Sequence, residues 1–165
     1  MSILVIGLGN ILLTDEGIGV HVVNTMKERY TFSPEPEILD GGTLGLDLLH
    51  FLEGKDKILL IDAVDFRKEP AHIGVLEDDN IPSQLFTKLS VHHIGLSDLL
   101  FAAKLLDMKP SKIRLIGIQP QSLELGLTMT EPIRAIMEDV IDLAVKSLEE
   151  WKVACVLRSP QKLSA

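Results

Sequence analysis

The chain has a single cysteine, Cys155, so it can form no internal disulfide and lacks the thiolates of a structural zinc site. A reducing cytoplasm is therefore the compartment that we expect. No basic segment precedes the first apolar run, which argues against a signal peptide. Every apolar run is also far shorter than the roughly 20 residues of a transmembrane helix, so we expect no membrane association.

Basic residues are scarce as well. Sixteen lysines and arginines stand against 24 acidic residues, which gives a net charge of −8, and they form no basic block. Nucleic acid is therefore not an expected partner, whereas the charge favours a cationic ligand or a basic partner surface. The 165 residues, 46% of them hydrophobic, suit one globular domain, which we place at residues 1–157 with a flexible tail at 158–165.

Short apolar runs alternate with amphipathic stretches along the chain. The apolar runs predict strands at 3–8, 37–40, 57–63, 73–76 and 113–118. The amphipathic stretches predict a helix after each of the first two strands, a third near residues 96–103, and a long helix from Thr130 with Pro132 in its first turn. This order predicts an α/β fold, one three-layer helix–sheet–helix domain with a largely parallel sheet.

Polar side chains gather where the predicted strands end, which is where open α/β sheets carry their functional groups. The first three strands lead to Asp15-Glu16, Asp40-Gly41-Gly42 and Asp62, and a later loop carries His92-His93. Carboxylates and an imidazole that converge from separate loops can hold a divalent metal ion. The two histidines are adjacent and point in opposite directions in an extended segment, so we expect only one of them to bind the ion.

Each acid also has a purely structural explanation. Asp15 can be the N-cap of the helix that follows, and Glu16 would interact favourably with the dipole of its first turn. Asp62 is harder to explain in this way, because it follows the buried run "KILLI", where a charge usually has a partner or a task.

The remaining reactive side chains are interpreted as structural. His21, His50 and His72 lack a matching acid nearby, and Cys155 is predicted to be a small buried apolar residue. No G-x-S-x-G turn is present, so a Ser-His-Asp triad finds no support.

The glycines near the N-terminus raise a nucleotide-binding alternative. A dinucleotide fingerprint needs G-x-G-x-x-G, but the chain has Gly7-x-Gly9-x-x-Leu12 and lacks the glycine that lets helix and strand pack closely. Acidic side chains at the start of the helix would also repel a pyrophosphate. A phosphate site is therefore disfavoured.

Five motifs in order resemble those of the [NiFe]-hydrogenase maturation endopeptidases: "GLGNILLTDEGIGV", "ILDGGT", "IDA", "SVHHIGLSDLL" and "GIQPQSLELGL". Each is loose by itself, but together they make a specific resemblance from about residue 3 to about residue 150. The resemblance implies a five-stranded twisted sheet between helices. It also implies an endopeptidase that removes a C-terminal extension from the hydrogenase large-subunit precursor after nickel insertion.

The resemblance also implies the metal ligands. Family members bind metal through an acid after the first glycine-rich turn, an aspartate that ends a central strand, and a histidine; Glu16, Asp62 and His92 match these three. His92 is preferred to His93 because the family pattern S-x-H-x-x-G, laid on residues 90–95, places its histidine at position 92. The same three residues are the expected catalytic groups.

Substrate recognition and the partner follow from the same resemblance. Asp40 is expected to recognise the substrate, and Gly41 and Gly42 to let its backbone approach, since they lack a β-carbon. Nickel is the expected cofactor, delivered by the precursor, and cadmium or zinc could replace it as a surrogate. We expect a cytoplasmic monomer that binds the nickel-loaded precursor, with the glycine-rich turn delivering Glu16 to the metal site.

Two alternatives stay open at this point. One is a non-catalytic nickel-recognition or chaperone module on the same fold, which would bind the precursor without cutting it. The other is a Rossmann-like nucleotide-binding protein.

Overall fold

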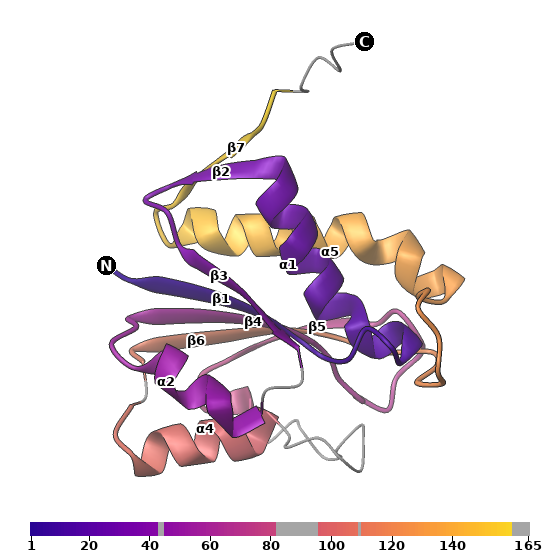
Figure 1. Ribbon diagram of the computed structural model, residues 1–165, viewed down its shortest axis with the longest axis horizontal. Helices are drawn as coiled ribbons and strands as arrows, with labels where there is room; N and C mark the ends of the chain where they lie inside the picture. The colour runs from indigo at the N-terminus through magenta and orange to yellow at the C-terminus, as the bar shows by residue number, and fades with distance from the viewer. Residues whose placement is uncertain (43–44, 82–95, 109, 160–165) are drawn as a thin grey trace.

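A five-stranded sheet lies between two layers of helices (Figure 1). The structure is a computed structural model that describes residues 1–42, 45–81, 96–108 and 110–159. The strands of the sheet are β1 (Ile3–Leu8), β3 (Glu37–Gly42), β4 (Lys57–Ala63), β5 (Ile73–Glu77) and β6 (Lys112–Ile118). The predicted α/β class and the five predicted strands are confirmed, with β3 reaching Gly42 instead of ending at Asp40.

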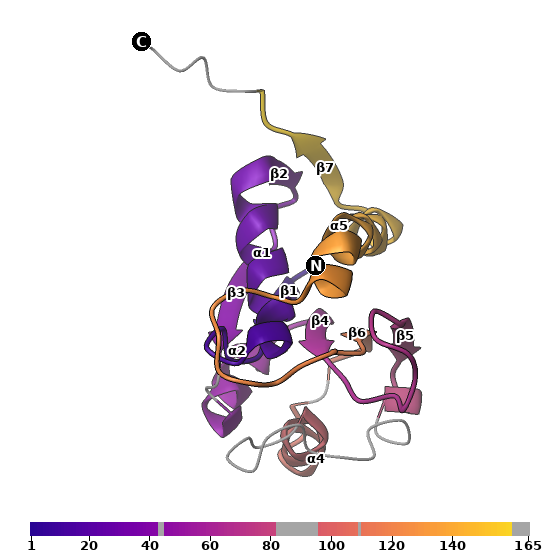
Figure 2. The same ribbon diagram turned by 90° about the vertical axis from the view of Figure 1, so that its right-hand side faces the viewer.

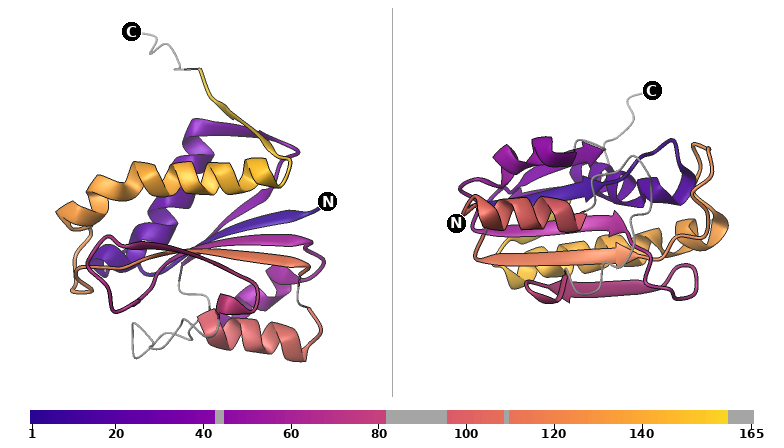
Figure 3. Two further views of the ribbon diagram at one scale, coloured as in Figure 1. Left: turned by 180° about the vertical axis from the view of Figure 1, so that it is seen from behind. Right: turned by 90° about the horizontal axis from the view of Figure 1, so that it is seen from below.

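The strand order is β3-β1-β4-β6-β5, in which the first four strands are parallel and β5 is antiparallel to β6. Strands β1 and β4 are central and almost wholly buried, which explains their continuous apolar sequences. The parallel strands end at one edge of the sheet, seen at the right of the second view in Figure 3. We call this the carboxyl edge.

Helices α1 (Ile18–Arg29) and α5 (Glu131–Glu150) cover one face of the sheet (Figures 1 and 2). Helix α5 begins after Thr130 with a proline in its first turn, as predicted. Helix α1 packs on the sheet through Ile18, Val22, Val23 and Met26, all of which are buried. None of the helices in the described ranges combines the length and apolarity needed to cross a membrane.

The opposite face carries α4 (Leu96–Leu105), α2 (Leu49–Leu52) and the 3-10 turn η2 (Gly45–Leu48) that leads into α2. The helix predicted after the second strand is present as η2 and the short α2, and Thr43, a residue type suited to cap it, lies outside the described residues. The core on this face is formed by alternate strand residues together with helix leucines, among them Leu4, Ile6, Leu60, Leu115, Leu48 and Leu52.

Two short strands form a second sheet that the sequence patterns do not predict. Strand β2 (Tyr30–Ser33) pairs antiparallel with β7 (Ala154–Leu157), beyond the ends of α1 and α5. Strand β2 follows α1 without an intervening turn residue, so its onset has no signal in the sequence. Cys155 lies in β7 and is half-buried where full burial was expected; desolvation raises its pKa to about 11. Arg158, assigned to the flexible tail, donates its backbone N–H to the Arg29 carbonyl oxygen at 2.7 Å.

Two glycines bring α1 into direct backbone contact with the sheet. A β-carbon on Gly19 would collide with the carbonyl oxygen of Ile61 in β4, and one on Gly7 would collide with the carbonyl oxygen of Gly19. The close helix–strand packing that a third fingerprint glycine would have provided is thus present, supplied by Gly19. As a result, the first turn of α1 lies beside the carboxyl end of β4.

Replacing Gly19 with alanine tests this contact. We expect Gly19→Ala to lower the free energy of unfolding by roughly 2–4 kcal/mol, because the clash is with backbone atoms that cannot move aside. Urea unfolding followed by circular dichroism measures the loss. The control is Gly54→Ala, where a β-carbon would meet nothing within 4 Å. Its cost is that of a non-glycine residue at a φ of +75°, about 1 kcal/mol. Equal losses in the two variants would contradict the packing argument.

Candidate active site

Glu16 reaches the carboxyl edge on a 3-10 turn, η1 (Thr14–Gly17), between β1 and α1. Gly9 makes this turn possible, because its φ of +116° redirects the chain and its missing β-carbon leaves room for the Glu16 carbonyl oxygen. The side chain of Glu16 is buried, including both carboxylate oxygens. The glycines therefore shape a turn that presents an acid, and the acid occupies the place where a nucleotide-binding loop would receive phosphate.

Asp62 lies at the end of β4, where strand alternation places it on the same side of the sheet as Leu60. It is 8% exposed. Desolvation, and next the nearby Glu16 carboxylate, raise the pKa of Asp62 to about 8, although a hydrogen bond from the Ala63 backbone lowers it somewhat. The structure thus brings two of the predicted metal ligands together as a buried pair of carboxyl groups, which resist carrying two negative charges at once. A divalent cation between them would relieve both the desolvation and the repulsion.

The predicted third ligand, His92, and its neighbour His93 lie in the segment 82–95, outside the described residues. Across the ranges that the structure describes, no three histidine, cysteine or acidic side chains converge in a way that could hold a metal. The described part of the site is therefore a carboxylate pair.

The predicted substrate-binding residues lie at the end of β3, on the same edge. Asp40 is exposed there, and Gly42 accepts a hydrogen bond at 3.0 Å from the backbone of Gly9, the residue that makes room for Glu16. A β-carbon on Gly41 would lie 2.7 Å from Ile6 Cγ2, so its missing side chain serves packing of the core, and its role in substrate approach stays a prediction. Gly42 does leave open space, because a β-carbon would approach only Asp40 Oδ1, at 3.6 Å.

Asp15 is not the N-cap of α1, contrary to the structural explanation considered for it. The N-cap is Gly17, and no side chain caps the helix. Asp15 is fully buried, and its Oδ2 accepts hydrogen bonds from the backbone of Gln121 and Ser122, at 2.9 and 3.0 Å. Thr130 donates its backbone N–H to Oδ1 and its hydroxyl to Oδ2, both at 2.7 Å. A buried carboxylate needs several donors, and the loop between β6 and α5 supplies more of them than the first turn of its own helix could.

Gln119 is a site-supporting residue that the sequence patterns did not single out. Its side-chain oxygen accepts the backbone N–H of Phe66 at 2.6 Å and that of Lys68 at 3.3 Å. These bonds shape the loop that follows Asp62. The available signal was the polar residue directly after the buried strand β6, within "GIQP". His72 lies against the same loop, where its ring meets that of Phe66 edge-on, with 5.5 Å between the ring centroids. This contact agrees with a structural role for His72.

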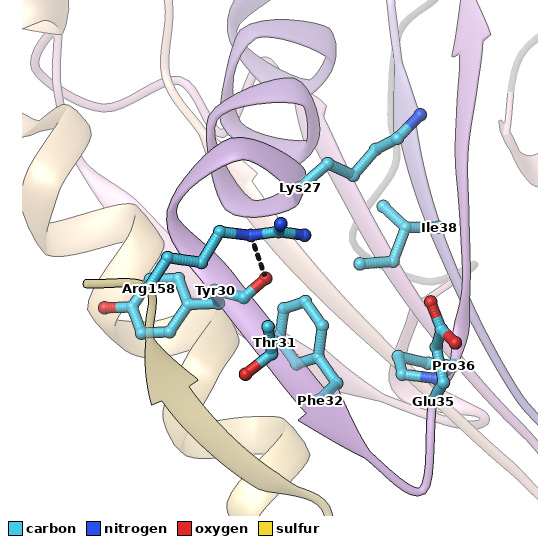
Figure 4. Close-up of a pocket in the computed structure, with 8 residues that line it drawn as sticks. All are labelled: Lys27, Tyr30, Thr31, Phe32, Glu35, Pro36, Ile38 and Arg158. Carbon is cyan, nitrogen blue, oxygen red and sulfur yellow. Dashed lines mark hydrogen bonds between the residues drawn. The ribbon is translucent and has the colours of Figure 1, made fainter. Parts of the chain in front are cut away.

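A pocket of about 390 Å³ lies at the opposite end of β3, near the second sheet (Figure 4). Arg158 closes one side of it by donating from Nε to the Tyr30 carbonyl oxygen at 3.2 Å. Its lining carries a single acid, Glu35, so it has no counterpart of the Glu16–Asp62 pair. The carboxyl edge therefore remains the candidate active site.

Comparison with known proteins gives a consistent result. A family model described as "Hydrogenase maturation protease" matches residues 20–147. The Hydrogenase 2 maturation protease of Escherichia coli (strain K12) is 38% identical over 159 residues, which cover 96% of this chain and 97% of that protein. The hydrogenase expression/formation protein HupD of Bradyrhizobium diazoefficiens is 42% identical over 161 residues, covering 95% and 83%. The solved structure of the hydrogenase maturating endopeptidase HybD from E. coli matches with a TM-score of 0.89 at 38% identity, covering 96% of this chain and 98% of that one.

The raised pKa of Asp62 predicts that the free energy of unfolding depends on pH. Asp62 carries its proton up to about pH 8 in the folded state but loses it near pH 4 when unfolded, so the folded state binds more protons in this window. The contribution of Asp62 to stability therefore falls as the pH rises from 4 to 8. Asp62→Asn cannot ionise, so we expect its advantage in free energy of unfolding over the natural chain to grow across this window, reaching a few kcal/mol at pH 8.

Urea unfolding at pH 5 and pH 8, with a chelator present, measures this difference. Asp47→Asn is the matched control, because Asp47 is exposed and its replacement should shift both curves little. An Asp62→Asn advantage that stays constant between the two pH values would contradict the argument.

Proposed function

This chain belongs to the hydrogenase maturation protease family, and from that premise we propose that it removes a C-terminal extension from a [NiFe]-hydrogenase large-subunit precursor after nickel insertion. As a family member it is a hydrolase that cuts a peptide bond in a hydrogenase precursor. The proposal adds the nickel requirement and the residues that sense the metal. It also places the reaction in the cytoplasm, carried out by a monomer.

The buried carboxylate pair is the observation that carries the proposal. A carboxyl group buried beside another is costly to ionise, which is why the pKa of Asp62 is raised, so the pairing of Glu16 with Asp62 favours a cationic ligand. Carboxylate oxygens together with one imidazole nitrogen, from His92, form a donor set that suits divalent nickel. In this proposal nickel arrives as part of the substrate, held by cysteine thiolates of the precursor. It must therefore keep coordination positions open for ligands from the protease.

The reaction is the hydrolysis of one peptide bond. The oxygen of a water molecule adds to the carbonyl carbon, and the C–N bond breaks. One proton of the water goes to the leaving amine, and the other is released when the new carboxyl group ionises. Nickel docked on Glu16, Asp62 and His92 would polarise the carbonyl group or lower the pKa of a bound water, either being worth several kcal/mol. The same three residues would then test for the metal and position the scissile bond. Asp40, exposed on the same edge, is proposed to recognise the substrate beside it.

Cleavage of a candidate precursor tests the proposal directly. We expect intact mass spectrometry to show loss of a discrete C-terminal peptide from the nickel-loaded precursor and no loss from the metal-free form. Equal cleavage of both forms would refute the nickel check. A stable complex without cleavage would instead support the non-catalytic recognition module.

Substitution of the three proposed ligands tests their roles. Glu16→Gln, Asp62→Asn and His92→Ala should each reduce the rate of processing by about 100-fold or more while the protein stays folded. His93→Gln should have a mild effect. The same processing assay with circular dichroism spectra decides this, and Asp47→Asn again serves as a control that should process normally. If His93→Gln abolished processing while His92→Ala stayed active, His93 would be the ligand instead of His92.

A further inference from the structure

Two loops at the carboxyl edge expose large apolar side chains next to the candidate active site. Ile11 and Leu12, between β1 and η1, are 42% and 51% exposed, and Leu125 and Leu127, between β6 and α5, are 85% and 71% exposed. We call these four residues the rim patch. Both loops leave the sheet at its carboxyl edge (Figure 3).

The two halves of the rim patch are joined by backbone pairing. Leu13 and Gly126 form a parallel β-bridge. The backbone of Gly126 donates to the Leu12 carbonyl oxygen at 2.8 Å, and that of Thr14 donates to the Gly126 carbonyl oxygen at 3.0 Å. Leu12 therefore lies next to the segment that carries Leu125 and Leu127, and the apolar surface spans both loops.

The rim patch also adjoins Glu16. A β-carbon on Gly17 would lie 2.8 Å from Ile11 Cα, so the backbone of the patch rests on the residue that follows Glu16. The backbone N–H of Glu16 donates to the Leu13 carbonyl oxygen at 3.1 Å. The rim patch therefore lies beside the turn that carries Glu16.

The exposure of these leucines is built into the fold. The β6–α5 loop is held by the hydrogen bonds to the buried Asp15 carboxylate and by the Thr14 hydroxyl, which donates to the Ser122 carbonyl oxygen at 2.7 Å. The loop therefore cannot fold its leucines inward without breaking bonds to a buried charge. An exposed apolar patch that a structure maintains in this way is typical of an interaction surface.

The surrounding charge restricts the kind of partner. Neither residues 3–26 nor residues 115–133 contain a lysine or arginine. An anionic partner such as nucleic acid or an acidic membrane surface would find no basic side chain in these segments. The patch therefore suits an apolar protein segment.

We propose that the rim patch binds an apolar segment of the hydrogenase large-subunit precursor that flanks the bond to be cut. The inference rests on the proposed function and adds to it a substrate contact outside the metal site. Binding there would hold the precursor while its metal docks on the carboxylate pair, so the patch contributes to recognition of the substrate and leaves the chemical step unchanged.

A double variant, Leu125→Gln with Leu127→Gln, tests the proposal in the processing assay with nickel-loaded precursor. We expect KM to rise about 10-fold or more with kcat within about twofold of the natural chain, because replacing apolar anchors with polar side chains removes binding energy that is equal in the ground and transition states. Leu105→Gln is the matched control, since Leu105 is 70% exposed at the far end of α4. It should leave both constants unchanged, and thermal melting should show all three proteins folded.

The possible failures are distinguishable. If the natural chain cleaves the precursor and the double variant has the same KM, the rim patch is not a substrate contact, although the proposed function stands. If the natural chain cleaves neither form of the precursor, the proposed function fails and this inference fails with it. An unchanged KM combined with a loss of self-association on size-exclusion chromatography, or of binding to phosphatidylcholine vesicles, would assign the patch to a second copy or to a membrane and overturn the proposal.

Discussion

The first turn of α1 lies directly on the backbone of β1 and β4, and the rest of the molecule depends on that contact. Gly7 and Gly19 allow it, because any side chain at either position would meet backbone atoms. Its consequence is chemical as well as structural. A helix start pressed against the end of a central strand buries Glu16 near Asp62, so the fold itself keeps two carboxylates together and out of water.

Adjacent acids take opposite roles at this contact. Asp15 and Glu16 are both buried, but Asp15 is surrounded by donors from the β6–α5 loop and stabilises the structure. Glu16 instead lies near Asp62, a second buried carboxyl group whose pKa it helps to raise, and the pair favours a cation. Asp15 is thus a structural charge, whereas Glu16, the next residue, is the acid that the proposed chemistry uses. The polar loop that satisfies Asp15 is also the one that carries half of the rim patch.

The main sheet could be predicted from the sequence, because buried parallel strands are continuous apolar runs and the amphipathic period of α5 is long. Glu16 and Asp62 were also predictable, as acids that follow glycine-rich or apolar strand ends. The role of Asp15 was not, because its partners lie more than 100 residues away in sequence and no local pattern encodes them. The packing role of Gly41 could not be predicted for a similar reason, since the side chain that fills its space, Ile6, belongs to another strand. Strand β2 was missed because it follows a helix with no turn residue between them.

Helices α1 and α5 are fastened together at both ends. At one end Asp15, just before α1, binds Thr130 at the start of α5. At the other end β2, which leaves α1, pairs with β7, which follows α5. A layer tied at both ends has little conformational freedom to lose when a large protein settles on the carboxyl edge. Under the proposed function, the entropic cost of association on this side of the candidate active site would therefore fall mainly on the precursor chain.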